Sequence, residues 1–321
     1  MPSPIFTEPA TLASATPVSD CPRPESPRAL PASVIALRQA FAGAVRPKKV
    51  TQRSVDFGTG HLDRLVCLRP GDRVDPSDLW DYAHDLLYTP IQPDLLRYLL
   101  PYCLEAWREN LRGLDRTCGA FVEHFSLVLA NGRIFDEHLA ATQAEAVARF
   151  LRESILEEME ARRDPHRLLG AMMTYGVLRP DIERLWTAWW SVESIGRAVT
   201  ALQYASCLIY SDDENPFFAP WTPEAGGGPP VLWDFEGHLY AHRWLDPNLE
   251  FLRHALTPAT LSHLITGALE RLADEPEQLI ARQMTADLPD RLVRVQSRCL
   301  ELPERLGTIP NLETTSFEWR R

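Results

Sequence analysis

The sequence predicts a mainly α-helical protein, folded as an irregular multi-helix bundle. Apolar residues recur three and four positions apart through most of the chain after residue 75, and helix-starting motifs stand in front of several of these runs. The 321 residues are 45% hydrophobic and 24% charged, which is enough apolar material for a sizeable core. These proportions exclude a collagen-like chain, a disulfide scaffold and a wholly disordered chain.

The N-terminal part carries the weakest helical signal. Residues 1–31 contain eight prolines with Ser, Ala and Thr between them, so we expect a disordered tail that acts as a spacer, with a docking tail as the alternative. A short helix is expected over residues 34–41. Residues 50–69 alternate weakly around Gly58 and Gly60, a pattern that is compatible with a small β-hairpin.

Helix signals become strong at Asp75. The pairs Asp75-Pro76 and Gln92-Pro93 each place a proline in the first turn of a helix, and apolar residues at helical spacing follow both. A long helix is then expected over residues 135–163, because apolar positions recur along one face and charges three and four apart along the other.

The second half of the chain has a clear internal break. A helix is expected over residues 165–175, and the run over 181–210 is apolar nearly all round, which predicts one central and most buried helix. Residues 211–230 hold five prolines and three consecutive glycines, typical of a linker or loop. We therefore expect a main helical domain over residues 32–210 and a smaller C-terminal helical part over 231–321 that packs on it.

Charge limits the classes of partner. The chain has 33 Lys and Arg against 44 Asp and Glu, a net charge of −11, which disfavours binding to nucleic acid. Residues 1–60 hold 7 basic and 4 acidic side chains, so the remainder holds 26 and 40, a net charge of −14. An acidic body attracts a basic partner, mainly by steering its approach.

Cysteine usage and hydropathy indicate the compartment. Six cysteines are scattered without a CxxC pair or a zinc-site spacing, typical of a reducing environment. The N-terminus has no signal-peptide pattern, and the uncharged stretch around residues 198–211 is shorter than the roughly 20 apolar residues of a membrane span. We expect a cytoplasmic protein with no membrane partner and no cofactor, a divalent transition metal being the alternative.

The first candidate for chemistry is a doubled Glu-His dipeptide. Glu123-His124 and Glu137-His138 lie on either side of a turn signal at residues 131–132. A hairpin of helices or strands centred there would bring together two imidazoles and two carboxylates, a set that suits a transition metal. Neighbouring residues point apart on a helix, however, so capping and surface charge pairs are the favoured interpretation.

Two weaker candidates also contain histidine. His238 and His242 share one face of a helix or a strand, but Leu239 stands where a zincin needs its general base. Another group begins near a helix start and consists of Asp78, Asp81, His84 and Asp85. The helix dipole explains its first acids, whereas the adjacent imidazole and carboxylate could form a tuned base.

The remaining candidates are arginines and tryptophans. Arginines lie on one helical face at Arg291, Arg294 and Arg298 and could bind phosphate, but a solvated or salt-bridged face is favoured in an acidic body. Six of nine tryptophans lie within residues 186–244. Core packing is their default interpretation, and four are candidates for a binding surface or groove: Trp186, Trp189, Trp190 and Trp221.

The sequence lacks the motifs of common enzyme classes. It has no phosphate loop, dinucleotide-binding fingerprint, nucleophile elbow or kinase signature set. We therefore expect a non-catalytic protein-binding protein, an adaptor or a neutralising partner, that uses an acidic, aromatic-containing surface. The alternative is a metal-assisted enzyme with a helical active site of histidines and carboxylates.

Overall fold

The chain folds into helices, as expected. The computed structural model describes residues 30–56, 58–69, 72, 74–112, 121–131, 134–161, 175–211, 214–217 and 243–308. Over these residues it contains helices and no strand, which confirms the mainly α-helical fold class. The chain divides into two compact units, residues 1–31 and 32–321, and nearly all described residues belong to the second.

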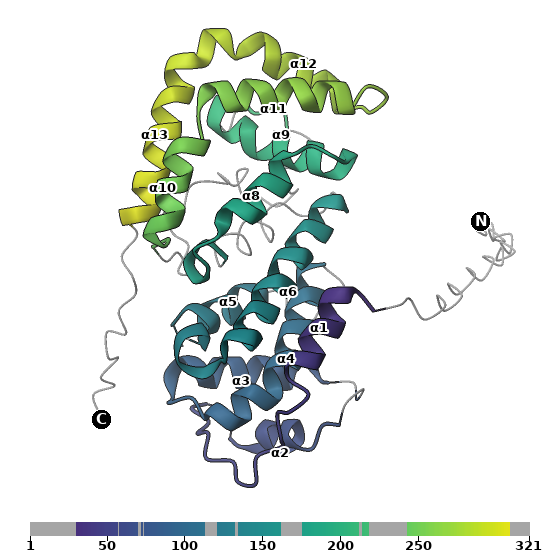
Figure 1. Cartoon of the computed structure of the whole chain (residues 1–321), viewed down its shortest axis with the longest axis vertical. Helices are drawn as coiled ribbons and strands as arrows, with labels where there is room; N and C mark the ends of the chain where they lie inside the picture. The colour runs from purple at the N-terminus through teal and green to yellow at the C-terminus, as the bar shows by residue number, and fades with distance from the viewer. Residues whose placement is uncertain are drawn as a thin grey trace, which may run out of the picture. The chain divides into compact units, whose positions relative to one another are not determined.

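The helices before residue 161 form one packed group. They are α1 (Ala32–Ala40), α2 (Gly60–Val66), α3 (Pro76–Tyr88), α4 (Pro93–Leu111), α5 (Phe121–Asn131), the π-helix η1 (Ile134–His138) and α6 (Ala141–Glu160). Helix α3 packs against α5 and α2, α4 packs against α5, and α1 packs against α6 (Figure 1).

The later helices pack around α9. They are α8 (Ile182–Trp190), α9 (Ile195–Ile209), α10 (Asp246–Ala255), α11 (Pro258–Arg271), α12 (Gln278–Asp287), the 3₁₀ helix η3 (Pro289–Arg291) and α13 (Leu292–Thr308). Helix α9 contacts α6, α8, α11 and α13, and α10 contacts α8 and α13. None of the described helices is both long and apolar enough to cross a bilayer.

The two helix starts predicted from proline are confirmed. Helix α3 begins at Pro76, and the carboxylate of Asp75 accepts a hydrogen bond from the backbone N–H of Ser77 at 2.9 Å. Helix α4 begins at Pro93. Proline in the first turn loses no intrahelical hydrogen bond, because the N–H groups there have no partner within the helix.

The β-hairpin considered for residues 50–69 is wrong. Residues 50–56 and 58–59 form neither helix nor strand, and α2 begins at Gly60. The side chain of Gln92, the residue that precedes α4, replaces a partner strand as a hydrogen-bond acceptor. The backbone N–H groups of Thr51 and Gln52 donate to the side-chain oxygen of Gln92 at 2.6 and 3.0 Å.

Both long helices predicted from apolar periodicity are shorter than expected. The helix predicted over 135–163 is instead the separate helices η1 and α6, and the side chain of Gln143 accepts the Ala140 N–H at the break. The helix predicted over 181–210 is α8 followed by α9. Ser194 caps α9 by accepting the Arg197 N–H at 3.1 Å, and Val192 adopts a left-handed backbone, with φ of 48°.

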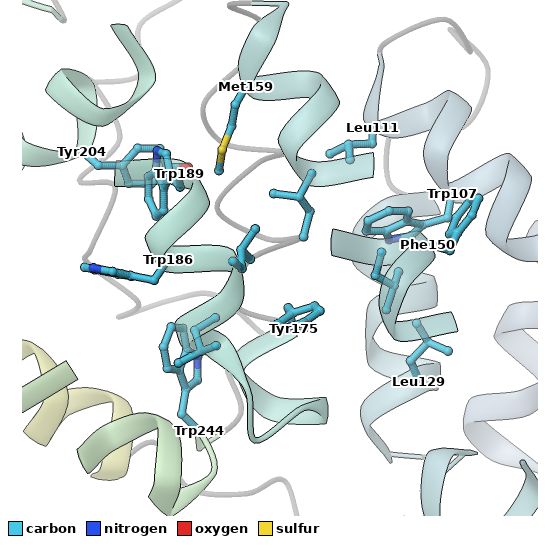
Figure 2. Close-up of a cluster of buried hydrophobic side chains, with 14 of the residues drawn as sticks. Trp107, Leu111, Leu129, Phe150, Met159, Tyr175, Trp186, Trp189, Tyr204 and Trp244 are labelled. Carbon is cyan, nitrogen blue, oxygen red and sulfur yellow. The ribbon is translucent and has the colours of Figure 1, made fainter. Parts of the chain in front are cut away.

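A continuous hydrophobic core joins both groups of helices. Figure 2 shows Trp107 beside Phe150 and, across the same cluster, Trp189 beside Tyr204. The rings of Trp189 and Tyr204 lie 4.5 Å apart in an edge-to-face arrangement. Helix α9 is buried at almost every position, so the expectation of a central buried element holds for α9 itself.

Helices α6 and α9 approach each other most closely at Gly196. A Cβ atom added there would lie 2.5 Å from the backbone oxygen of Glu160 and 2.6 Å from that of Met159. Only glycine fits this contact without moving backbone, because no flexible side chain can retreat. Arg197, the next residue, pairs with the Glu160 carboxylate at 2.7 Å and reinforces the contact.

Several expected elements lie outside the described residues. They are the tail over residues 1–29, most of the helix over 165–175 and most of the break over 211–230. Within the break, Asn215 and Phe217 are described and buried.

The Gly196 contact predicts an unusual cost for a small substitution. We expect Gly196→Ala to lower the free energy of unfolding by about 1–3 kcal/mol, because the methyl group overlaps the backbone of α6. Urea denaturation measures this change. Gly43→Ala is the matched control, since an added Cβ there meets no atom within 4 Å. A loss in the control as large as in Gly196→Ala would contradict the steric explanation.

Candidate functional site

Histidines and aspartates from separate segments converge beside α3. The group comprises His61, His84, His124, Asp56, Asp81 and Asp85, and we call it the histidine–aspartate cluster. Helix α2 supplies the first histidine, α3 the second, and α5 the third. Because α3 packs against both α2 and α5, these side chains meet although more than 60 residues separate the first from the last.

The innermost contact of the cluster is a buried His61–Asp85 pair. His61 Nε2 lies 2.8 Å from Asp85 Oδ2, and both side chains are at most 1% exposed. The other carboxylate oxygen accepts the Val55 backbone N–H at 2.9 Å. His61 Nδ1 is buried and has no hydrogen-bond partner among the described residues. A carboxylate with two such partners is stabilised in place, and a pair so enclosed is out of reach of a dissolved substrate.

The same region fastens the irregular segment before α2 to the helices. The Gln52 side chain bonds to the Thr89 hydroxyl and accepts the Gln92 N–H at 3.0 Å. The Gln92 side chain in turn donates to the Lys49 carbonyl oxygen at 2.8 Å. These reciprocal amide contacts replace the ladder that a second strand would provide.

The outer part of the cluster is aromatic. Trp80, His84 and Tyr88 stand four residues apart and therefore share one face of α3. His124 of α5 lies parallel to this face, 5.0 Å from the Trp80 ring and 5.6 Å from the His84 ring. Tyr88 ends the row and is 55% exposed. The rings run from a half-buried tryptophan to an exposed phenol.

Carboxylates lie along this aromatic row. His84 Nε2 lies 3.1 Å from Asp56, whose side chain is 60% exposed. Burial raises the pKa of Asp81, and the nearby Asp78 and Asp85 act in the same direction. Asp78 is held separately by a two-point contact with Arg64 at 2.5 and 2.9 Å. The acidic group is therefore partly solvated at Asp56 and enclosed at Asp85.

The His124 imidazole has a pKa well below its ordinary value. Burial against the rings of α3 lowers its pKa to about 4, and the neighbouring His84 acts in the same direction. His124 is therefore neutral near pH 7 and acts there as a polar aromatic ring.

Of the three described side chains of the doubled Glu-His motif, the structure brings one into the cluster. His124 faces α3, whereas Glu137 is exposed and His138 half-buried in η1. The side chain of Glu123 lies outside the described residues. Among the side chains that are described, no three His, Cys, Asp or Glu have a metal-binding arrangement.

The tryptophan candidates lie mainly in the core. Trp186 and Trp189 are 6% and 0% exposed, so neither forms the expected surface, and Trp190 is half-buried with its ring stacked on Trp186 at 4.7 Å. Core packing is confirmed for the two buried rings. Trp221 lies outside the described residues, as do His238 and His242.

The arginine stripe is a salt-bridged face, as favoured. Arg291 and Arg294 contact the Glu214 carboxylate at 2.6 and 3.4 Å. Arg298 donates to the carbonyl oxygens of Cys207 and Tyr210 and thereby caps the end of α9.

Comparison with other proteins adds no assignment. No protein-family model matches this chain, and neither a curated protein nor a solved structure matches it. The function must therefore be argued from the residues themselves.

Sequence reasoning missed several members of the site. His61 and Asp56 carry no local motif, and only the packing of their segments on α3 brings them near it. The row of Trp80, His84 and Tyr88 was readable, because four-residue spacing on a predicted helix places side chains on one face.

Burial of the His61–Asp85 pair predicts that replacing Asp85 costs more stability than replacing Asp56. We expect Asp85→Ala to lower the free energy of unfolding by about 2–4 kcal/mol, because His61 and the Val55 N–H both lose a buried partner. Asp56→Ala removes a similar His–Asp contact at the surface, so about 1 kcal/mol or less is expected. Urea denaturation at pH 7 compares the two variants, and equal losses would contradict the role of burial.

The lowered pKa of His124 predicts a loss of stability in acid. Between pH 6.5, the ordinary pKa of histidine, and about pH 4, His124 binds a proton in the unfolded chain but not in the folded chain. The contribution of neutral His124 to the free energy of unfolding is therefore lost as the pH falls toward about 4. Partial solvent contact limits this loss to roughly 1–2 kcal/mol.

Replacement of His124 should remove that loss. Relative to the wild type, His124→Gln should gain roughly 1–2 kcal/mol between pH 7 and pH 4.5 in urea denaturation. His263→Gln, at an exposed position on α11, is the control. An identical pH dependence in His124→Gln and the wild type would refute the assignment.

Proposed function

We propose that this protein is a non-catalytic binding protein that docks a basic segment of a partner protein on α3. The docking surface consists of Trp80, His84, Tyr88, Asp56 and Asp81, which we call the α3 face. One observation carries the proposal: the exposed Tyr88 ring and the solvated Asp56 carboxylate both contact His84, at the end of an aromatic row.

The chemistry of the α3 face suits a cationic side chain. Aromatic faces attract ammonium and guanidinium groups, and carboxylates bind guanidinium through two hydrogen bonds. His84 and Tyr88 lie 4.8 Å apart with rings tilted by 51°, so they offer ring surface in two orientations. A net charge of −11 favours the approach of a basic partner to the chain as a whole.

The enclosure of the His61–Asp85 pair favours binding over catalysis. A general base must come within hydrogen-bond distance of its substrate, and this pair is at most 1% exposed. The pair instead holds Val55 and thereby the neighbouring Asp56 at the α3 face. The metal-assisted alternative has no ligand set among the described side chains.

The proposal predicts weaker binding of a basic probe when the face is altered. We expect Asp56→Asn/Tyr88→Ala to raise the dissociation constant of a fluorescein-labelled Arg-rich peptide roughly tenfold, because a carboxylate and a ring face are lost. Fluorescence anisotropy at about 0.15 M salt measures it, with nonspecific attraction partly screened.

Asp274→Asn is the matched control, since it removes one exposed negative charge away from the α3 face. Equal weakening in this control would mean that net charge alone attracts the peptide. Unchanged binding in the double variant would show that the peptide does not bind at the α3 face. A basic protein captured from lysate by the wild type and by the control, but not by the double variant, would identify the partner.

A further inference from the structure

A second surface lies on α13 and is independent of the α3 face. Its outward side exposes Val293 and Leu300, which are 85% and 66% exposed. Seven residues make nearly two turns, so these side chains lie on one face about 10 Å apart along the axis. Two large apolar side chains aligned on a solvent-exposed helix form a short hydrophobic seam.

The inward side of α13 already has its packing partners. Val295, Cys299, Leu302 and Leu306 are buried, and the helix contacts α9, α10 and α11 (Figure 1). The exposed seam on the opposite side therefore does not contribute to this core. We call the exposed residues the α13 face: Val293, Arg294, Ser297, Leu300, Glu301 and Glu304.

Charges on the α13 face change sign along the helix. Arg294 lies near its N-terminal end, and Glu301 and Glu304 lie near its C-terminal end with the exposed Arg305 beside them. Glu304 also pairs with Arg253 at 3.0 Å. Arg294 and Glu301 are seven residues apart and therefore flank the apolar seam on the same side. Arg294 reaches Glu214 only at 3.4 Å, because Arg291 holds the same carboxylate oxygen at 2.6 Å.

The surface beside the seam is hollowed. An open hollow of about 710 Å³ is lined by Val293, Ser297 and Glu301, together with arginines of the same helix. Another, of about 450 Å³, is lined by Leu300, Glu301, Glu304, Arg305 and Thr308. Side chains of an adjoining helix could enter both hollows while its backbone follows α13.

We propose that the occupant of the α13 face is the α13 face of a second copy of this chain, packed antiparallel about a two-fold axis near Ser297. A two-fold interface must be self-complementary, since each residue meets its counterpart in both directions. In this arrangement Val293 lies opposite Leu300 of the other copy, and Arg294 lies opposite Glu301 of the other copy.

Helix geometry allows both sets of contacts at once. In an antiparallel pair the same flank of each helix meets, so the flank that carries Arg294 and Glu301 faces its own counterpart. Reversal of direction then places the basic end beside the acidic end. Ser297 lies at the crossing point, where its small side chain permits close approach.

The charge pattern favours a second copy over a basic partner. A basic partner would be repelled at Arg294, whereas a second copy satisfies both signs. One pair of short helices buries less than the roughly 1,200–2,000 Å² of a standard stable interface. We therefore expect a weak, concentration-dependent dimer.

Sedimentation of the full chain tests the proposal. Between about 10 µM and 1 mM at about 0.15 M salt, the weight-average mass should rise from 36.4 kDa toward twice that value. Arg294→Glu places carboxylates opposite each other, and Glu301→Arg places guanidinium groups opposite each other. Each variant alone should weaken dimerisation at least tenfold.

Mixing the two charge variants gives the decisive result. Each variant then presents the charge that the other lacks, so an equimolar mixture should form the dimer again. The double variant Arg294→Glu/Glu301→Arg should form a dimer without any partner variant. Leu300→Gln should also weaken the dimer, whereas Leu279→Gln, at a 70% exposed leucine of α12, is the control for apolar exposure.

Three results would overturn the proposal: a monomer at 1 mM, a dimer insensitive to the charge variants, or no recovery in the mixture. Because the α3 face is unaltered in these variants, peptide binding there reports separately on the proposed function. Loss of dimerisation with peptide binding intact would therefore concern the α13 face alone, and loss of peptide binding with the dimer intact would concern the α3 face alone.

Discussion

The close contact between α6 and α9 at Gly196 is the constraint on which the rest of the structure depends. The missing side chain lets the backbone of α9 lie directly against the C-terminal end of α6. Helix α9 then becomes the buried element against which α11 and α13 pack, and Arg298 of α13 caps its end. The position of α13, and with it the charged and apolar face, follows from a contact that only glycine permits.

A second constraint operates beside α3. The buried Asp85 carboxylate and the Gln92 amide accept backbone N–H groups of a segment that forms neither helix nor strand. The Gln52 side chain of that segment accepts the backbone N–H of Gln92 in return. This polar network is structural, since Asp85 and Gln52 are buried and Gln92 is half-buried. The network also holds Asp56 against His84 at the edge of the aromatic row, where the proposed function needs this carboxylate.

The two surfaces differ in the partner they suit. The α3 face combines rings with carboxylates and suits a basic segment, whereas the α13 face carries both charge signs and suits a second copy of itself. If both proposals hold, a dimer presents two α3 faces. A partner with two basic segments would then bind with a gain in effective concentration, provided its linker spans the sites.

The sequence by itself determined the helical class and the starts of α3 and α4, because local spacing and capping chemistry decide these features. The partner of the arginine face, Glu214, lies far away in the sequence and was decided by the tertiary structure. The four-residue spacing of Trp80, His84 and Tyr88 on a predicted helix also places their rings on one face. Apolar periodicity continued across residues 139–140 and 191–194, so the breaks there were missed; side-chain capping and a left-handed Val192 decide them. Core packing was already the default interpretation of Trp186 and Trp189, and their burial confirms it. Only the tertiary structure decided that His61 and His124 meet α3, because contacts between distant segments leave no local signal in the sequence.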